Sequence, residues 1–187
     1  MRVEQPAAWS APQRWLHWTI AGLIAAALPL AWAMVAVPFR QLLLKFALYQ
    51  AHKTVGLSVL MLTLIQITLH VVRGRPPREA GGAPWQRKAA TATHAMLFAL
   101  LLITPILGYL TAAAAPVHIP TLLFGVLAIP HIIGPNAALF AVLRPLHLGM
   151  ALTLAVLASG HVTMAVWHHL QGRPTLRRMR SGSQSAP

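Results

Sequence analysis

Four long apolar segments constrain this chain most, because a helix that spans a membrane needs about 20 predominantly apolar residues. Segments of this kind cover residues 15–37, 48–72, 89–113 and 146–170. Residues with prolines and glycines follow the second and fourth of them. The sequence therefore predicts an all-α, integral membrane four-helix bundle. We expect a single domain over residues 1–180 and a disordered tail over residues 181–187.

Composition supports a membrane protein and excludes several other classes. Apolar residues make up 57% of the chain and charged residues only 9%, whereas a soluble domain averages about 25% charged residues. So few charges could not cover the surface of a soluble protein, and so apolar a chain is not a disordered one. The absence of cysteine excludes disulfides, iron–sulfur clusters, thiol catalysis and covalent c-type haem attachment.

The basic residues indicate how the chain is oriented. There are 15 Lys and Arg residues against 2 acidic ones, but they cluster between apolar segments, as topology signals do, so no nucleic-acid partner is expected. The larger group should face the cytoplasm, which places both termini inside. This group comprises Arg2, Arg14, Arg73, Arg75, Arg78, Arg87, Lys88, Arg173, Arg177, Arg178 and Arg180. The smaller, outer group comprises Arg40, Lys45, Lys53 and Arg144.

Two segments have alternative interpretations. The first span could be a cleaved signal peptide, because Ala31-Trp32-Ala33 resembles a cleavage site. Against this, Trp15, His17 and Trp18 interrupt its beginning, and the apolar run continues past the site. Residues 114–143 are apolar, contain four prolines and carry two histidines. We expect them to form a cap on the outer end of the bundle, which can include a short interfacial helix.

Histidines are the chemically informative residues, since a polar ring inside a membrane span is costly unless it has a partner. His147 and His161 lie 14 residues apart on the fourth span, which is about 21 Å along a helix and about 40° short of four full turns. Both rings therefore face one side, at two depths. His52 lies at the level of His147. His17, His70 and His94 all remain candidates to pair with His161.

Two histidine pairs at two depths suit two b-type haems, each with one ring on either face of the macrocycle. Two axial ligands leave no open position on the iron, which favours electron transfer. Zinc is disfavoured because no cysteine or intramembrane acid is present, and the same lack of carboxylates disfavours a proton pump. A simpler explanation is that neighbouring groups merely satisfy each ring. Small residues that could admit a flat cofactor are Ala21, Gly22, Gly56, Gly149 and Gly160.

Several motifs, taken in order, resemble the bacterial cytochrome b561 family, whose members are four-helix di-haem proteins of the inner membrane. They cover nearly the whole chain. The motifs are Arg14-Trp15-Leu16-His17-Trp18, His52-Lys53-Thr54-Val55-Gly56, Pro84-Trp85-Gln86-Arg87 with His94, Pro105 and Gly108, Phe124-Gly125, Gly134-Pro135-Asn136, and His147, His161 and His168-His169.

The resemblance implies a ligand set and also shows departures. It implies that His17 and His161 bind an inner haem and that His52 and His147 bind an outer one. His94 would then support the site rather than bind iron. Gln66 and His70 stand where the family usually has arginines, and Leu148 stands where it often has an acid. These departures concern the family's contacts with haem propionates and quinone near the inner haem.

The resemblance also implies partners, because family members use ubiquinone and some resemble superoxide oxidases. An anionic donor could be steered to the outer face by Lys53 and Arg144, together with Arg40 and Lys45. These cations could instead be interfacial anchors. On the inner side, His168 is the candidate to bind quinone and supply a proton, with His169 and Trp167 beside it. This group could instead merely lie among the lipid headgroups.

Three functions are therefore compatible with the sequence. The first is an oxidoreductase that moves electrons from an outer donor, such as superoxide, to quinone. The second is a cytochrome subunit that relays electrons to or from a redox partner protein. The third is a haem or metal transporter. Each would act in the bacterial inner membrane, and a homodimer is compatible with all three.

Overall fold

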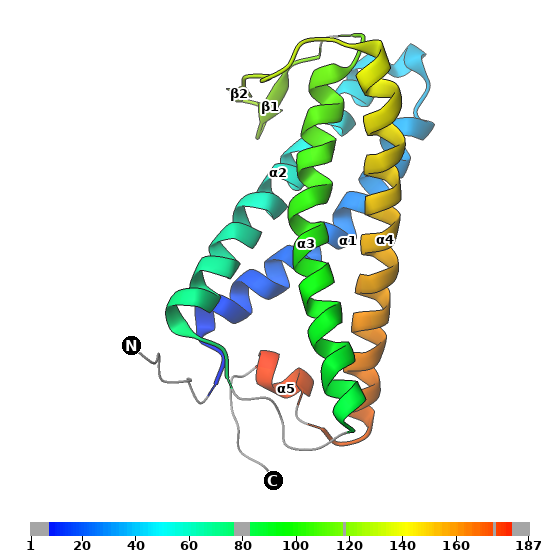
Figure 1. Cartoon of the computed structure of the whole chain (residues 1–187). Helices are drawn as coiled ribbons and strands as arrows, with labels where there is room; N and C mark the ends of the chain where they lie inside the picture. The colour runs from blue at the N-terminus through cyan, green and yellow to red at the C-terminus, as the bar shows by residue number, and fades with distance from the viewer. Residues whose placement is uncertain (1–7, 77–82, 118, 174, 181–187) are drawn as a thin grey trace.

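A computed structural model describes residues 8–76, 83–117, 119–173 and 175–180. The tail predicted at 181–187, together with Arg2, Arg78 and His118, lies outside the described residues. Four long helices form the molecule (Figure 1): α1 (Ala11–Ala36), α2 (Leu42–Arg73), α3 (Pro84–Ala114) and α4 (Ala137–Leu170). Each is long and apolar enough to cross a membrane. The predicted all-α, four-span membrane architecture is confirmed.

Helices α1 and α4 begin earlier than their apolar stretches, and polar residues cap their starts. At α1, the Ser10 amide and hydroxyl donate to Gln13 Oε1 at 3.1 and 2.9 Å. At α4, Asn136 Oδ1 accepts a hydrogen bond from the Leu139 amide at 2.9 Å. α4 therefore begins at Ala137 rather than near Leu146, and Pro145 lies inside it. The helical part of the predicted outer cap is thus continuous with the fourth span.

The helices form two pairs. α1 packs along α2 and α3 packs along α4, while α2 also contacts α3 (Figure 1). All four contribute to one aliphatic layer, made of Ile20, Val59, Leu100, Leu101 and Leu154. Leu154 lies midway along α4 between His147 and His161. The layer therefore separates the two levels at which the sequence places histidine pairs.

The connection from α1 to α2 contains the short helix η1 (Phe39–Gln41) and is held by a buried lysine. Lys45 is only 8% exposed. Its Nζ donates to the carbonyl oxygens of Met34 at 2.9 Å and Val37 at 2.8 Å. Those carbonyls belong to the last turn of α1 and to the residue that follows it, where the helix has no further amides to bind them. Lys45 thus caps α1 and is not the accessible outer cation that the sequence suggested.

The outer segment folds as a β-hairpin, with β1 (Thr121–Leu123) antiparallel to β2 (Leu127–Ile129). Its turn places Phe124 at φ 54° and Gly125 at φ 76°. Two side chains of α2 hold β1. Gln50 donates to Pro120 O at 2.8 Å and accepts from the Leu122 amide at 3.0 Å, and the Thr54 hydroxyl accepts from the Phe124 amide at 3.2 Å. The cap is therefore a hairpin against α2, not a separate interfacial helix.

The short helix α5 (Thr175–Arg180) lies at the inner end of the molecule, lower in the view than the start of α1 and the end of α2 (Figure 1). The indole of Trp18 in α1 donates to Met179 O at 3.0 Å. Nearby, the buried Gln13 amide donates to Gly74 O at 3.2 Å and joins the beginning of α1 to the end of α2. The start of α1 and the end of α5 therefore lie at the same, arginine-rich end of the bundle.

Candidate functional site

The outer pair of histidines joins α2 to α4. The ring centres of His52 and His147 are 6.3 Å apart, and the ring planes cross at 80°. Both side chains are half-buried. The structure thus brings together the two residues that the sequence placed at the outer level.

The ring of His147 is held by α3. Its Nδ1 donates a hydrogen bond to the carbonyl oxygen of Thr104 at 3.0 Å. A Cβ atom at Gly108 would stand 2.9 Å from its Cε1 atom, so only glycine leaves room for the ring at this position. With the proton on Nδ1, the Nε2 atom keeps its lone pair, which is the form in which imidazole binds a metal.

The inner pair joins α1 to α4. The ring centres of His17 and His161 are also 6.3 Å apart, with the planes at 67°. His94 of α3 lies nearer to His161, at 5.2 Å, and its Nδ1 donates to Ala90 O. His70 does not contact either ring, since its aromatic neighbours are Trp9 and Phe98. Of the three candidates to pair with His161, His17 and His94 therefore reach it.

The ring spacing fits an iron between two imidazoles. A metal–imidazole bond is about 2 Å long, and each ring nitrogen lies about 1 Å from its ring centre, so two rings bound to one iron have centres about 6 Å apart. The 6.3 Å of both pairs matches this value, and the 5.2 Å between His94 and His161 is shorter. Within the described residues, no group of three or more His, Cys, Asp or Glu side chains is arranged to bind a bare metal ion.

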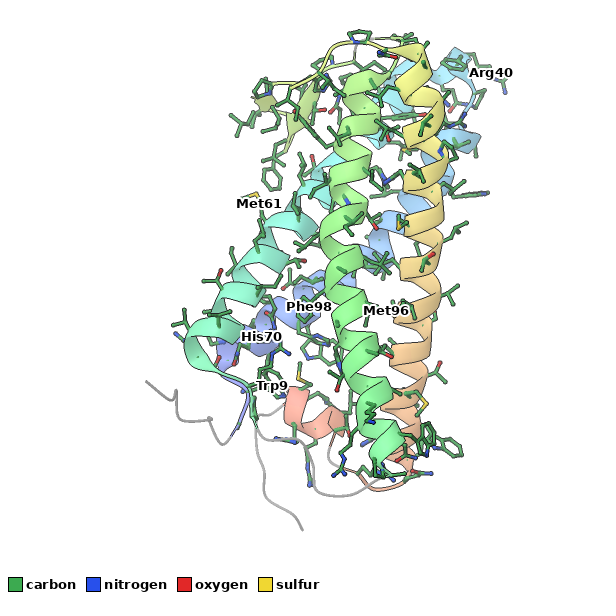
Figure 2. All side chains as sticks on the ribbon, in the orientation of Figure 1. Trp9, Arg40, Met61, His70, Met96 and Phe98 are labelled. Atoms are coloured by element: carbon green, nitrogen blue, oxygen red, sulfur yellow. The ribbon has the colours of Figure 1, made fainter. Side chains whose placement is uncertain are left out.

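The outer cations are less accessible than the sequence suggested. Lys53 Nζ donates to the carbonyl oxygens of Ile119 and Pro120, both at 3.2 Å, and so fastens the cap to α2. Arg144 is exposed on α4, one turn before His147. Arg40 is exposed at the outer end, on the side away from the hairpin (Figure 2). Arg144 is the exposed cation nearest in sequence to a candidate ligand.

The three candidate quinone contacts on α4 face different ways. His168 is half-buried, and its Nδ1 has no hydrogen-bond partner among the described residues. It follows His161 by seven residues, about two helical turns, and so lies on the same face. Trp167 is 55% exposed and His169 is also exposed. Only His168 therefore lies on the same side as the inner pair.

Gln66 and His70 form a polar pair that the sequence identified only as a departure. Gln66 is 4% exposed, and its amide nitrogen donates to His70 Nε2 at 3.1 Å. The His70 ring contacts Trp9 at 5.4 Å and Phe98 at 5.6 Å (Figure 2). The spacing offered a signal, because His70 follows His52 by 18 residues, which is five helical turns. Apart from the motif that contains Pro105 and Gly108, no sequence feature indicated that Thr104 and Gly108 contact His147.

Comparisons with known proteins indicate which family the chain resembles. The sequence model described as prokaryotic cytochrome b561 matches residues 8–182. A curated protein named "Cytochrome b561 homolog 2", from Escherichia coli (strain K12), is 31% identical over 139 residues. That match covers 73% of this chain and 72% of the relative.

Proposed function

Because the chain belongs to the prokaryotic cytochrome b561 family, it is a multi-pass b-type cytochrome of the bacterial inner membrane, and we propose that it carries electrons from a donor at the outer face to the quinone pool. The observation that carries the proposal is the pair of matching histidine sites. Each has ring centres 6.3 Å apart, and the two sites share α4.

The proposal assigns His52 and His147 to an outer haem b and His17 and His161 to an inner haem b. Each bound haem would supply a one-electron Fe(III)/Fe(II) couple. Helices α1, α2 and α4 supply the ligands, and α3 orients His147. Because His147 and His161 are 14 residues apart, the two sites are about 21 Å apart along α4.

Partner binding at the two ends rests on different side chains. On the outer face, Arg144 and Lys53 would attract an anionic donor such as superoxide. On the inner side, His168 has a ring nitrogen that could donate a hydrogen bond to a quinone oxygen, and it is half-buried on the His161 side of α4. Ubiquinone is the acceptor that this arrangement would serve, with Trp167 and His169 as flanking residues.

One observation favours a second candidate, a cytochrome subunit that relays electrons to or from a redox partner protein. Lys45 caps α1, and Lys53 fastens the hairpin, so both use hydrogen bonds to backbone carbonyls. This leaves fewer free cations to steer superoxide. Rapid reduction of the purified protein by superoxide favours the oxidoreductase, whereas reduction only by a bound partner protein favours the relay.

The deciding experiment is haem quantification in protein purified in detergent, combined with oxidised and dithionite-reduced optical spectra. We expect two low-spin b-type haems per chain. His52→Ala and His147→Ala should each lose one haem, and His17→Ala and His161→Ala the other. His94→Ala is the matched control and should retain both. Folded protein without haem would overturn the proposal.

A further inference from the structure

The two histidine sites have different polar surroundings, and we propose that these surroundings give the inner haem the higher midpoint potential, so that electrons move downhill from the outer face inward. This inference rests on the two haems of the proposed function. It assigns Thr104 and Gly108 as positioning residues for the outer ligand and the inner arginines as groups that stabilise the reduced inner haem.

At the outer site, one ligand is polarised by the protein backbone. The Thr104 carbonyl oxygen accepts a hydrogen bond from His147 Nδ1, with the two atoms 3.0 Å apart. Gly108 lets the ring lie close enough to make this bond. A hydrogen bond of this kind increases electron density on the ring and makes it a stronger ligand. A stronger ligand favours ferric over ferrous iron, and so lowers the midpoint potential of the outer haem.

At the inner site, the ligands lack this polarisation. Within the ranges that the structure describes, neither His17 nor His161 has a hydrogen bond to a carbonyl oxygen. Their neighbours are aromatic rings instead: Trp18 lies 5.4 Å from His17, and His94 lies 5.2 Å from His161. The two sites therefore differ in the hydrogen bonding of their ligands, which is one property that sets electron density on the iron.

Positive charge acts in the same direction. Arg14 is half-buried one turn below His17, where its guanidinium donates to Trp9 O at 2.7 Å. The Arg75 guanidinium is exposed, and therefore partly screened, but it lies 6.0 Å from the Phe98 ring, which contacts His70. Nearby positive charge stabilises the reduced haem, because reduction removes one positive charge from the site. These cations therefore raise the midpoint potential of the inner haem.

The outer cations offset this difference only weakly. The buried Lys45 directs its ammonium to the carbonyl oxygens of Met34 and Val37 at the end of α1. Lys53 follows the ligand His52, but its ammonium points to the cap, where two carbonyl oxygens lie at 3.2 Å. Arg40 and Arg144 are exposed, so water and salt screen them. The hydrogen bond to the outer ligand and the positive charge near the inner site therefore both make the midpoint potential of the inner haem the higher one. An electron would then pass from the group held by His52 and His147 to the group held by His17 and His161, and no bond would have to form or break.

An anaerobic optical redox titration of the purified full-length protein tests this ordering. We expect two one-electron transitions. At any applied potential, the ratio of reduced to oxidised haem should be at least tenfold higher at the inner site than at the outer site. This ratio corresponds to a difference in midpoint potential of about 59 mV. The higher transition should survive in His52→Ala and the lower in His17→Ala. Coincident transitions, or the reverse assignment, would overturn the inference and leave the proposed function standing. A single haem in the unmutated protein would overturn both.

Charge variants test the cause. Arg14→Gln should lower the inner transition and leave the outer one in place, and Arg75→Gln serves as a second variant if the first folds poorly. Arg40→Gln is the matched control, since this exposed arginine lies at the outer end (Figure 2), and it should move neither transition. An inner transition that stays in place in both inner variants would contradict the assigned role of the arginines.

Discussion

The ring of His147 lies against Gly108, one turn above Thr104 on α3, where a Cβ atom would stand 2.9 Å from its Cε1 atom. The carbonyl oxygen of Thr104 accepts a hydrogen bond from His147 Nδ1. Helix α3 thus provides none of the four proposed ligands and yet determines how one of them is oriented.

Gly108→Ala should therefore weaken the outer haem site. The new methyl group must displace the ring, at a cost of about 1–3 kcal/mol, which is typical of overpacking. We expect haem content to fall from two toward one per chain, and any outer haem that remains to have a raised midpoint potential. Gly134→Ala is the control, because nothing lies within 4 Å of a Cβ atom there. Full haem content in Gly108→Ala would contradict the role of this glycine.

Lys45→Met should lower the thermal stability of the protein without changing its reaction with an anionic donor. The substitution leaves the carbonyls at the end of α1 without their donor, and buried unpaired groups of this kind cost about 1–3 kcal/mol each. Thermal unfolding in detergent measures the effect. Arg40→Met, at a nearby exposed residue, should leave the melting temperature in place. Equal melting temperatures for the two variants would show that Lys45 is not a cap.

Gln50→Leu should release the hairpin from α2. The amide of Leu122 and the carbonyl of Pro120 both lose their partner, and hydrogen exchange over residues 119–129 should become faster. Thr68→Val is a suitable control, since its hydroxyl only donates to Leu64 O of the same helix. Unchanged exchange in Gln50→Leu would mean that other contacts hold the hairpin.

Arg144→Gln should slow reduction by superoxide several-fold at low ionic strength, and the difference should shrink as salt is added, because the attraction is screened over about 10 Å at 0.1 M. Stopped-flow optical measurement of haem reduction gives the rate. Arg173→Gln removes a charge at the opposite end and should have the unmutated rate. A salt-independent rate would argue for the relay function instead.

His168→Phe should slow haem reduction by a soluble quinol, since the substitution removes the half-buried ring nitrogen on the His161 face. His169→Phe, at the exposed neighbour, should have little effect. Both variants should keep two haems. If the two variants behave alike, quinone binds elsewhere on the protein.

The length of the apolar segments and the helical period predicted the features that depend on helix geometry alone. The four spans and the common face of His147 and His161 follow from apolar length and from 3.6 residues per turn. Periodicity could not choose between His17 and His94, because both reach His161 and only their ring spacing separates them. His70 was excluded only by its contacts with Trp9 and Phe98.

The outer cap was harder to predict. Its prolines and apolar residues do not alternate with a regular period, so the sequence did not predict the two strands. The position of the hairpin also depends on hydrogen bonds to Gln50 and Thr54, which are distant in sequence. The early start of α4 was missed because Asn136 was grouped with the loop rather than read as a cap. The roles of Lys45 and Lys53 also needed three dimensions, since nothing in a lysine's sequence position shows which carbonyls its ammonium will reach.

The aliphatic layer formed by Ile20, Val59, Leu100, Leu101 and Leu154 also determines what can accompany an electron through the molecule. Its side chains contain no group that carries a proton, so in the proposed reaction these residues would let an electron cross without a proton. Each turnover then charges the membrane, negative inside, and the voltage opposes the next transfer by up to about 2.3 kcal/mol per 100 mV. Electron transfer through the protein would therefore build up a membrane potential, and its rate would fall as that potential rises.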